Sequence, residues 1–111
     1  MINAHLTGNK IISNEQEAFS LNERSSFGEK KSGKIEYSTI EVLFLVQEEK
    51  MLVFLGKRHL NFDKLLKRAK KQDKKIETKL PVYSDLRKRG YIVKSALKFG
   101  AEFRIYEKGV R

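Results

Sequence analysis

The sequence has 111 residues, of which 40% are apolar, so it can form one domain, or one small domain and part of another. It contains no cysteine, which excludes a disulfide framework, a thiol nucleophile and thiolate metal sites. The net charge is +10, and residues 57–89 alone carry thirteen Lys and Arg against four Asp and Glu, which indicates either a polyanionic partner such as nucleic acid or a solvated, lysine-rich helix face.

The N-terminal segment predicts short strands. Apolar residues alternate with polar ones over residues 2–6 and a Gly-Asn turn signal follows, so we expect two or three strands within residues 1–22. Residues 23–34 are polar, with two glycines and three serines, and predict a loop. The first ten residues lack the basic start and apolar centre of a signal peptide, and no apolar run is long enough to span a membrane. A cytoplasmic protein without membrane contact is therefore expected.

The middle of the sequence predicts a buried helix and a core strand. Ser38 and Glu41 have the spacing of a capping box, in which the serine hydroxyl accepts from the N–H of Glu41 and the carboxylate reaches back to the N–H of Ser38. The helix that follows, IEVLFLVQEE, is apolar on nearly every side, so we expect it to be buried. Residues 51–55 then predict a core strand, closed by Gly56.

A basic amphipathic helix is expected next. Asn61 can cap it, and lysines and arginines cover most of its surface. Its apolar residues recur at helical spacing on one face: Phe62, Leu65, Leu66, Ala69 and Ile76. Pro81 should end, kink or restart this helix, because proline lacks an N–H and disfavours helix in the preceding residue. We place a second helix from Pro81 to Arg89, supported by an Asp85–Arg89 pair and capped by Gly90.

The last segment predicts a β-hairpin. Strands are favoured over residues 91–95 and 102–107, with a turn at residues 98–100 between them. In the second strand, Phe103 and Ile105 should face a core, and Arg104 and Tyr106 should face the other side.

The expected fold is therefore mixed α/β, of the α+β kind. A small N-terminal sheet-and-helix domain is expected over residues 1–80. Residues 81–111 should then form the first helix and β-hairpin of a second domain, which is incomplete as given.

Few residues have the spacing of a catalytic or metal site. His5 and His59 are far apart and have no acidic or histidine neighbours at ligand spacing, and neither a phosphate-loop motif nor a Ser–His–Asp triad can be assembled. A tyrosine serves as a general base or acid when nearby cations lower its pKa, and Arg104 is expected on the same strand face as Tyr106. On chemistry alone, packing is the more common role for such a strand tyrosine.

The stretch VYSDLRKRGYIVKSALKFGAEFRIYEKG, residues 82–109, resembles the start of the catalytic domain of the archaeal tRNA-splicing endonucleases. The family pattern runs roughly V-Y-x-D-L-R-x-R-G-Y-I-V-K and then K-F/Y-G-x-x-F-R-x-Y-E-x-G. The sequence departs from it at residues 95–97, Ser-Ala-Leu, where Thr-Gly-Phe or Thr-Gly-Leu is more usual. A weaker likeness lies upstream, where residues 37–45 are similar to the family's L-S-x-x-E-A-L-Y-L helix and residues 60–63 to its L-S-F-E segment.

The resemblance implies a role in removing tRNA introns. Family members cut precursor RNA at bulge–helix–bulge elements: a ribose 2′-hydroxyl attacks the adjacent phosphate and leaves a 2′,3′-cyclic phosphate and a 5′-hydroxyl, without a metal or other cofactor. A tyrosine acts as general base, a histidine as general acid, and a lysine stabilises the charged transition state. The tyrosine falls on Tyr106. The histidine and lysine of the family lie beyond Arg111, so we expect either a truncated chain that is inactive alone or one half of a split enzyme.

The same resemblance implies precursor tRNA as a partner, together with further endonuclease subunits in a homo- or hetero-oligomer. Basic residues in the motif are expected to contact RNA: Arg87, Arg89, Lys94, Lys98 and Arg104. Two alternatives stay open. One is a non-catalytic RNA-binding or assembly subunit that uses the basic segment 57–89, and the other is a lysine-rich structural module with no RNA role.

Overall fold

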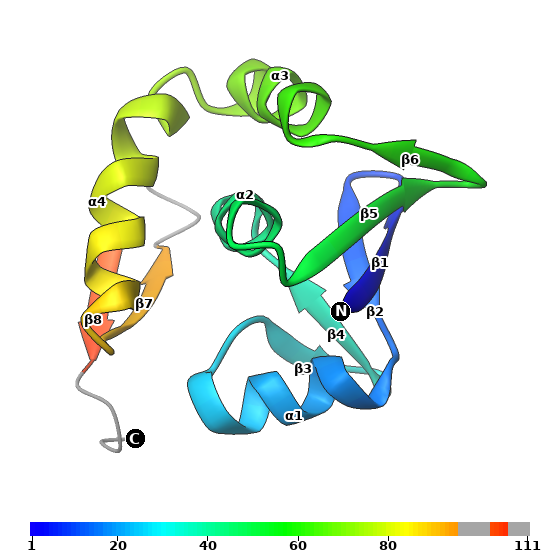
Figure 1. Cartoon of the computed structure of the whole chain (residues 1–111), viewed down its shortest axis with the longest axis horizontal. Helices are drawn as coiled ribbons and strands as arrows, with labels where there is room; N and C mark the ends of the chain where they lie inside the picture. The colour runs from blue at the N-terminus through cyan, green and yellow to red at the C-terminus, as the bar shows by residue number, and fades with distance from the viewer. Residues whose placement is uncertain (96–102, 107–111) are drawn as a thin grey trace.

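The computed structural model describes residues 1–95 and 103–106, which form a mixed α/β fold (Figure 1). Its elements in chain order are β1 (Ile2–Thr7), β2 (Lys10–Ser13), α1 (Gln16–Ser25), β3 (Glu29–Lys31), β4 (Lys34–Tyr37), α2 (Thr39–Gln47), β5 (Met51–Leu55), β6 (Arg58–Leu60), α3 (Phe62–Gln72), α4 (Ile76–Lys88), β7 (Ile92–Ser95) and β8 (Phe103–Tyr106). Six strands form one sheet in the order β3-β4-β2-β1-β5-β6, with β1 and β5 parallel and the other neighbours antiparallel. The strands β7 and β8 pair separately.

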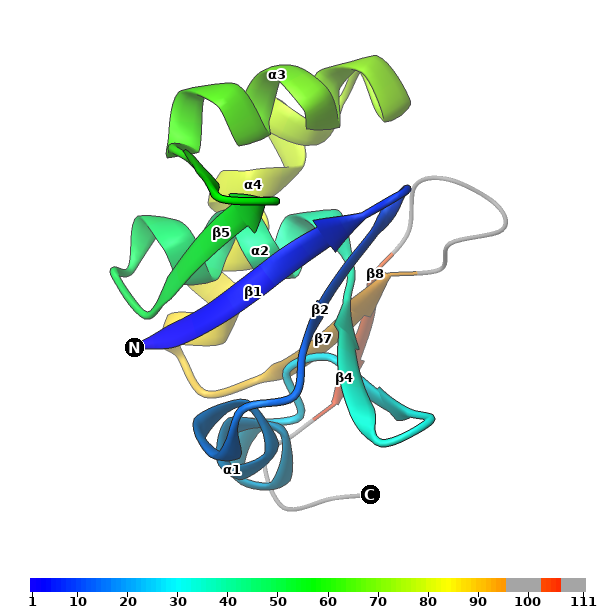
Figure 2. The ribbon, with the colours of Figure 1, turned by 90° about the vertical axis from the view of Figure 1, so that its right-hand side faces the viewer.

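Helix α2 lies at the centre of the molecule. It packs on β5 on one side and on α3 and α4 on the other, so it joins the six-stranded sheet to the C-terminal part of the chain (Figures 1 and 2). All residues from Ile40 to Leu45 are buried. This confirms the prediction of a buried helix, since a helix apolar on every side needs neighbours on every side.

The N-terminal alternation was interpreted correctly as strands, but only as far as residue 13. Ile2, Ala4 and Leu6 are buried on one face of β1, which turns back into β2. The prediction of two or three strands within residues 1–22 is confirmed with two strands. The rest of the segment begins α1, in which Ala18 and Leu21, three residues apart, bury one face. The predicted loop over residues 23–34 was wrong in part, since α1 extends into it and β3 begins at Glu29.

The capping box at the start of α2 is confirmed. The Ser38 hydroxyl accepts from the Glu41 N–H, and the Glu41 carboxylate accepts from the Ser38 N–H at 2.9 Å. The cap of the next helix is confirmed as well, because the Asn61 side chain accepts from the Lys64 N–H at 2.9 Å. Both helix starts could be placed because each cap is formed within three residues of sequence.

The boundary between the two C-terminal helices differs from the prediction. Helix α3 ends at Gln72, because Asp73 adopts an extended backbone and its carboxylate accepts from the Lys75 N–H and the Lys79 ammonium instead. Ile76 therefore begins α4, which runs on through Pro81. The expectation that proline would end or restart the helix was wrong. The side chains of Pro81 and of Glu77, four residues earlier, are exposed, so water can satisfy the carbonyl that the proline leaves without an N–H partner.

We expect a Gly28→Ala substitution to destabilise the fold by about 3 kcal/mol or more. Gly28 has a φ of +78°, and a Cβ there would lie 2.3 Å from Ile35 Cγ2 and 3.1 Å from the Glu36 carbonyl oxygen. Gly33 offers a matched control, since its φ is +76° but a Cβ would meet nothing within 4 Å. Gly33→Ala should cost only about 1 kcal/mol, the penalty of the left-handed backbone. Urea denaturation of both variants measures the difference, and equal losses would contradict a steric role for Gly28.

Glu15 is expected to make stability depend on pH in the acid range. Its carboxylate accepts from the Asn3 backbone N–H at 2.7 Å and the Asn3 side-chain amide at 3.1 Å, and these bonds hold its pKa below the usual range. A pKa lowered by folding means that the stabilisation is present above the unfolded-state pKa and is lost as pH falls through the folded-state pKa. Glu15→Gln should therefore flatten the acid-side fall of the unfolding free energy, measured by urea denaturation. Glu17→Gln is the control, and equal pH profiles for the two variants would contradict this role.

The division at residue 80 stays a prediction, and that residue falls inside α4. Among the residues that the structure describes, no helix is long and apolar enough to cross a membrane. The mixed α/β class is confirmed: a six-stranded mixed sheet and four helices precede the helix-linked hairpin of β7 and β8 in the described chain.

Candidate functional site

The predicted catalytic tyrosine ends strand β8. In the antiparallel register of β7 and β8, Tyr106 pairs with Ile92, and Arg104 pairs with Lys94. The structure places the backbones of Tyr106 and Arg104, while their side chains and the whole of Lys98 lie outside the described residues. The hairpin itself is confirmed by this register, and the strand that supports Tyr106 is β7.

Strand β7 is held to the N-terminal part of the chain by Lys94. Its ammonium donates to the carbonyl oxygens of Ser26 and Gly28, and it lies 3.3 Å from the Glu41 carboxylate. Two groups from the α1–β3 connection and one from α2 therefore fix one side chain of β7. Because Lys94 pairs with Arg104 across the hairpin, this anchor also fixes β8 two residues before Tyr106.

Glu41 is the buried carboxylate of this cluster, with 4% of its surface exposed. One oxygen accepts from the Ser38 N–H and hydroxyl, and the other accepts from the Gly28 N–H at 2.7 Å and faces Lys94. A buried carboxylate is costly unless it is paired and fully hydrogen-bonded, and here both conditions are met. One glutamate thus caps α2, holds the turn at Gly28 and neutralises the lysine of β7.

Arg87 is a second cation directed inward, and only 9% of its surface is exposed. Its guanidinium lies 3.8 Å from the centre of the Phe27 ring and donates to the carbonyl oxygens of Ser25 and Tyr91 at 2.8 and 3.3 Å. It also donates to the Tyr83 hydroxyl at 3.2 Å. Burial, and then the charge of Glu41, raise the pKa of Tyr83 well above its usual range, so this phenol stays neutral.

Two of the five predicted RNA-contact residues, Arg87 and Lys94, use their side chains in contacts inside the fold. Arg87 donates to the carbonyl of Ser25 at the end of α1, and Lys94 donates to carbonyls of the α1–β3 connection. Arg89 is exposed and forms the expected pair with Asp85, with 3.2 Å between Nε and the carboxylate oxygen. Phosphate contacts by Arg89, Lys98 and Arg104 stay predictions. The contacts that join Arg87 and Lys94 to the N-terminal part of the chain could not be found from sequence, because those partners lie more than fifty residues away.

One strand prediction was wrong. Ile105 was expected to face a core together with Phe103, but 51% of its side chain is exposed. Val93, which pairs with Ile105 in β7, is fully buried. Val93 and Ile105 differ in exposure because β7 packs against α4, whereas β8 is the outer strand of the pair.

The two histidines come closer than their sequence separation suggests. His5 on β1 and His59 on β6 flank Phe54 of β5, with ring centroids 6.0 and 5.7 Å from that of Phe54. Both histidines are exposed, as expected for surface positions. Within residues 1–95 and 103–106, no group of three histidine or acidic side chains is placed to hold a metal ion.

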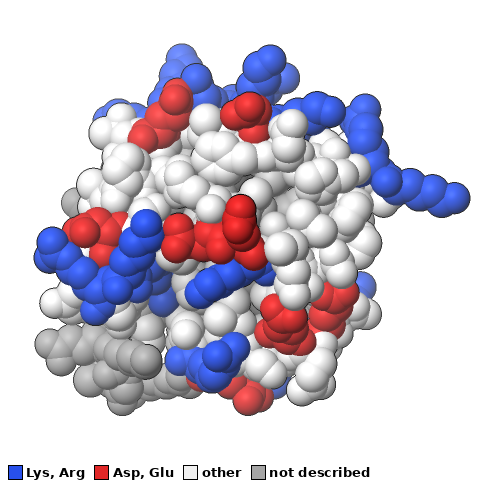
Figure 3. Space-filling model, viewed as in Figure 1, with Lys and Arg blue, Asp and Glu red and all other residues white. Residues whose placement is uncertain are grey.

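A basic hollow that was not singled out from the sequence lies between β6 and α3. We call it the α3 groove. It is open, has a volume of about 530 Å³, and is lined by Arg58, Leu60, Lys64, Lys67, Arg68 and Lys71. Figure 3 shows basic side chains along the upper edge of the molecule, over α3, and at the upper right, over the β5–β6 turn. The sequence predicted a cationic helix face here, but β6 was needed to turn that face into a groove.

Comparison with known proteins gives the same family for both parts of the chain. Residues 2–66 match the family model for the tRNA intron endonuclease N-terminal domain, and residues 76–111 match that for the tRNA intron endonuclease catalytic C-terminal domain. Among curated proteins, the chain is similar to tRNA-splicing endonucleases of Thermococcus onnurineus (42% identity), Thermococcus gammatolerans (40%) and Methanococcus vannielii (34%). The matches cover 95%, 99% and 96% of the chain and 62%, 66% and 61% of these relatives, so the chain spans somewhat less than two thirds of their length.

Proposed function

The chain belongs to the tRNA intron endonuclease family, and we propose that it acts in tRNA intron removal by contributing Tyr106 to the cleavage of precursor tRNA at bulge–helix–bulge sites. The observation that carries the proposal is the match of both its parts, in order, to the N-terminal and catalytic domains of this family. The position of Tyr106 on a strand anchored by Lys94 supports it, because a general base needs a fixed position relative to the bond that it acts on.

The proposed reaction is an internal transesterification. Tyr106, as general base, takes the proton from a ribose 2′-hydroxyl, and the freed oxygen attacks the adjacent phosphorus. The bond from phosphorus to the 5′-oxygen breaks, and that oxygen takes a proton from a general acid. The products are a 2′,3′-cyclic phosphate and a 5′-hydroxyl. The step consumes no water and needs no redox partner.

We propose that neither histidine of the sequence takes the place of the family's general acid and that no lysine of it takes the place of the family's catalytic lysine. His5 and His59 lie on β1 and β6, in the six-stranded sheet rather than on the hairpin that carries Tyr106. We therefore propose that the acid and the lysine come from residues outside this sequence, in a longer chain or in a second endonuclease subunit, and that the working enzyme is an oligomer.

Cleavage of a bulge–helix–bulge RNA tests the proposal. The chain alone, a C-terminal catalytic-domain fragment of a relative alone, and their mixture would each be incubated with the labelled RNA. We expect cleavage at the bulges only in the mixture. Efficient cutting by the chain alone would refute the need for an outside histidine and lysine. No cutting by a mixture that is shown to assemble would refute the catalytic proposal.

The second candidate is a non-catalytic RNA-binding or assembly subunit, and the α3 groove is the observation that favours it. This function predicts tight, salt-dependent binding of precursor tRNA, because each phosphate neutralised by a lysine or arginine releases counterions. It also predicts that a complete endonuclease keeps its rate when the chain carries Tyr106→Phe. The rate of that variant therefore decides between the two functions.

A further inference from the structure

We propose that the α3 groove is a phosphate-binding site that holds a double-stranded part of the precursor RNA away from the cleaved bond. The proposal rests on the proposed function, since it assumes that the chain binds precursor tRNA. It adds a site on the N-terminal part of the chain, formed by Arg58 of β6 and four cations of α3, none of them in the catalytic segment.

Among the residues that the structure describes, the groove cations form no ion pair, whereas two neighbouring lysines do. Lys70 lies 2.6 Å from Glu77, and Lys79 lies 2.6 Å from Asp73. In contrast, none of the five groove cations has an ion pair within the part of the chain that the structure describes. The positive charge of this one side of α3 is therefore not balanced within the fold, and it creates a field that attracts polyanions.

The spacing and chemistry of the groove suit the backbone of a nucleic acid rather than its bases. Lys64, Lys67 and Lys71 lie three and four residues apart on one side of α3, and Lys64 and Lys71 are about 10 Å apart along the helix. A row of cations of this length can contact several phosphates along one nucleic-acid strand. Leu60 is the apolar member. Among the described residues no aromatic side chain lines the groove, so they offer no surface on which unpaired bases would stack.

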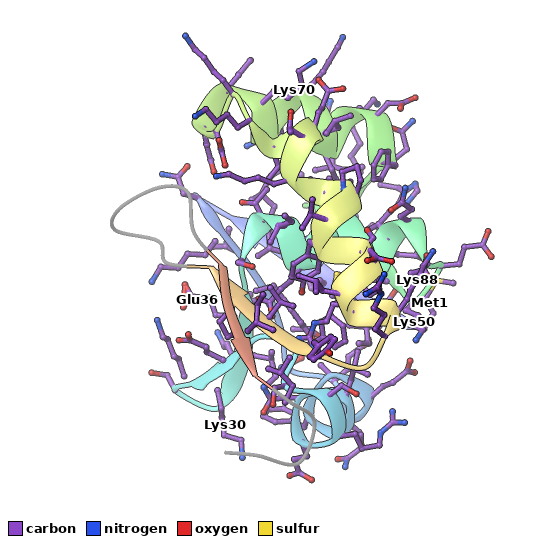
Figure 4. The ribbon with its side chains drawn as sticks, turned by 90° about the vertical axis from the view of Figure 1, so that its left-hand side faces the viewer. Met1, Lys30, Glu36, Lys50, Lys70 and Lys88 are labelled. Atoms are coloured by element: carbon purple, nitrogen blue, oxygen red, sulfur yellow. The ribbon has the colours of Figure 1, made fainter. Side chains whose placement is uncertain are left out.

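The position of the groove determines which part of the RNA it can contact. Helix α4 starts beside the end of α3 and runs for 13 residues, about 20 Å, to the beginning of β7 (Figures 1 and 4). Tyr106 pairs with Ile92, at that far end of α4. An RNA that reaches both Tyr106 and the groove must therefore extend well beyond the cleaved bond, and a helix that flanks the bulges has this length and rigidity.

Equilibrium binding of the full chain to labelled precursor tRNA tests the proposal. The variant Lys67→Gln/Lys71→Gln removes two groove charges from exposed positions. The control Lys34→Gln/Lys50→Gln removes two exposed charges elsewhere, and Figure 4 shows Lys50 beside Lys88, well away from α3. We expect the groove variant to bind about 10-fold or more weakly and to lower the slope of log affinity against log salt by about 1.5. The control should change affinity by less than about 3-fold.

A second RNA, with the bulges intact but the flanking helices cut to a few base pairs, tests whether the groove contacts a flanking helix. The groove variant should lose little affinity for it relative to the unaltered chain. Equal losses for the groove variant and the control on precursor tRNA, or an equal groove effect on both RNAs, would overturn the proposal while leaving the proposed function standing. If the unaltered chain, alone or completed by the C-terminal fragment, bound no precursor tRNA, both proposals would fail.

Discussion

A Tyr106→Phe substitution is expected to slow RNA cleavage by the completed enzyme by about 10²- to 10⁴-fold. Phenylalanine keeps the ring and its packing and removes only the hydroxyl oxygen that would take the proton from the ribose 2′-hydroxyl. Binding of the precursor should change by less than about 2-fold, since the lost group acts on the transition state. Single-turnover cleavage by the chain mixed with a C-terminal catalytic fragment measures the rate, and RNA binding measures the ground state.

Tyr91→Phe is the matched control for this prediction. Tyr91 also belongs to the motif, lies one residue before β7, and is 36% exposed. Its variant should cut at close to the normal rate. If the Tyr106 variant cut as fast as the Tyr91 variant, Tyr106 would be a structural residue, and the chain would be an RNA-binding or assembly subunit.

Replacing Glu41 by alanine is expected to cost about 3 to 5 kcal/mol of the free energy of unfolding. The substitution leaves the partly buried Lys94 ammonium without its counter-charge and removes the acceptor of the Gly28 and Ser38 N–H groups. It also destroys half of the capping box of α2. For a chain of this size, such a loss is a large part of the total stability. Urea denaturation followed by circular dichroism measures it.

Glu36→Ala is the matched control, because it removes ion pairs with exposed lysines instead of the buried carboxylate. Glu36 forms ion pairs with Lys31 at 3.2 Å and Lys10 at 3.8 Å, and both lysine side chains are at least 60% exposed. Exposed pairs of this kind contribute about 1 kcal/mol or less. If Glu36→Ala and Glu41→Ala destabilised the protein equally, the cluster around Lys94 would not be what holds β7 in place.

Sequence reasoning succeeded where the deciding contacts are local. The caps at Ser38 and Asn61 depend on residues three positions apart, and the sequence alone placed both helix starts. The family motif placed the hairpin and Tyr106 by pattern. The second function of Glu41 could not be found in this way, because Gly28 is 13 residues and Lys94 53 residues away.

The errors have related causes. Asp73 ends α3 because its side chain accepts hydrogen bonds in place of the helical backbone pattern. Pro81 is tolerated inside α4 because it lies on an exposed side of that helix. Neither effect is visible in the composition, so the boundary between the two helices was predicted in the wrong place. The RNA contacts of the motif's basic residues stay predictions, since charge was the only property of these side chains that the sequence made visible. The fold uses Arg87 and Lys94 internally, whereas the five cations that line the α3 groove form no ion pair with any residue that the structure describes.

The chemistry of the cut RNA ends is the most direct test of the proposed function. Bulge–helix–bulge RNA would be cleaved by the chain completed with a C-terminal catalytic fragment, and both new ends analysed. We expect a 2′,3′-cyclic phosphate, which resists phosphatase until acid opens it, and a 5′-hydroxyl, which a kinase labels directly. These ends should disappear with Tyr106→Phe. A 3′-hydroxyl and a 5′-phosphate, the products of attack by water on the same phosphate with the 3′-oxygen as leaving group, would contradict the 2′-hydroxyl mechanism and the role of Tyr106.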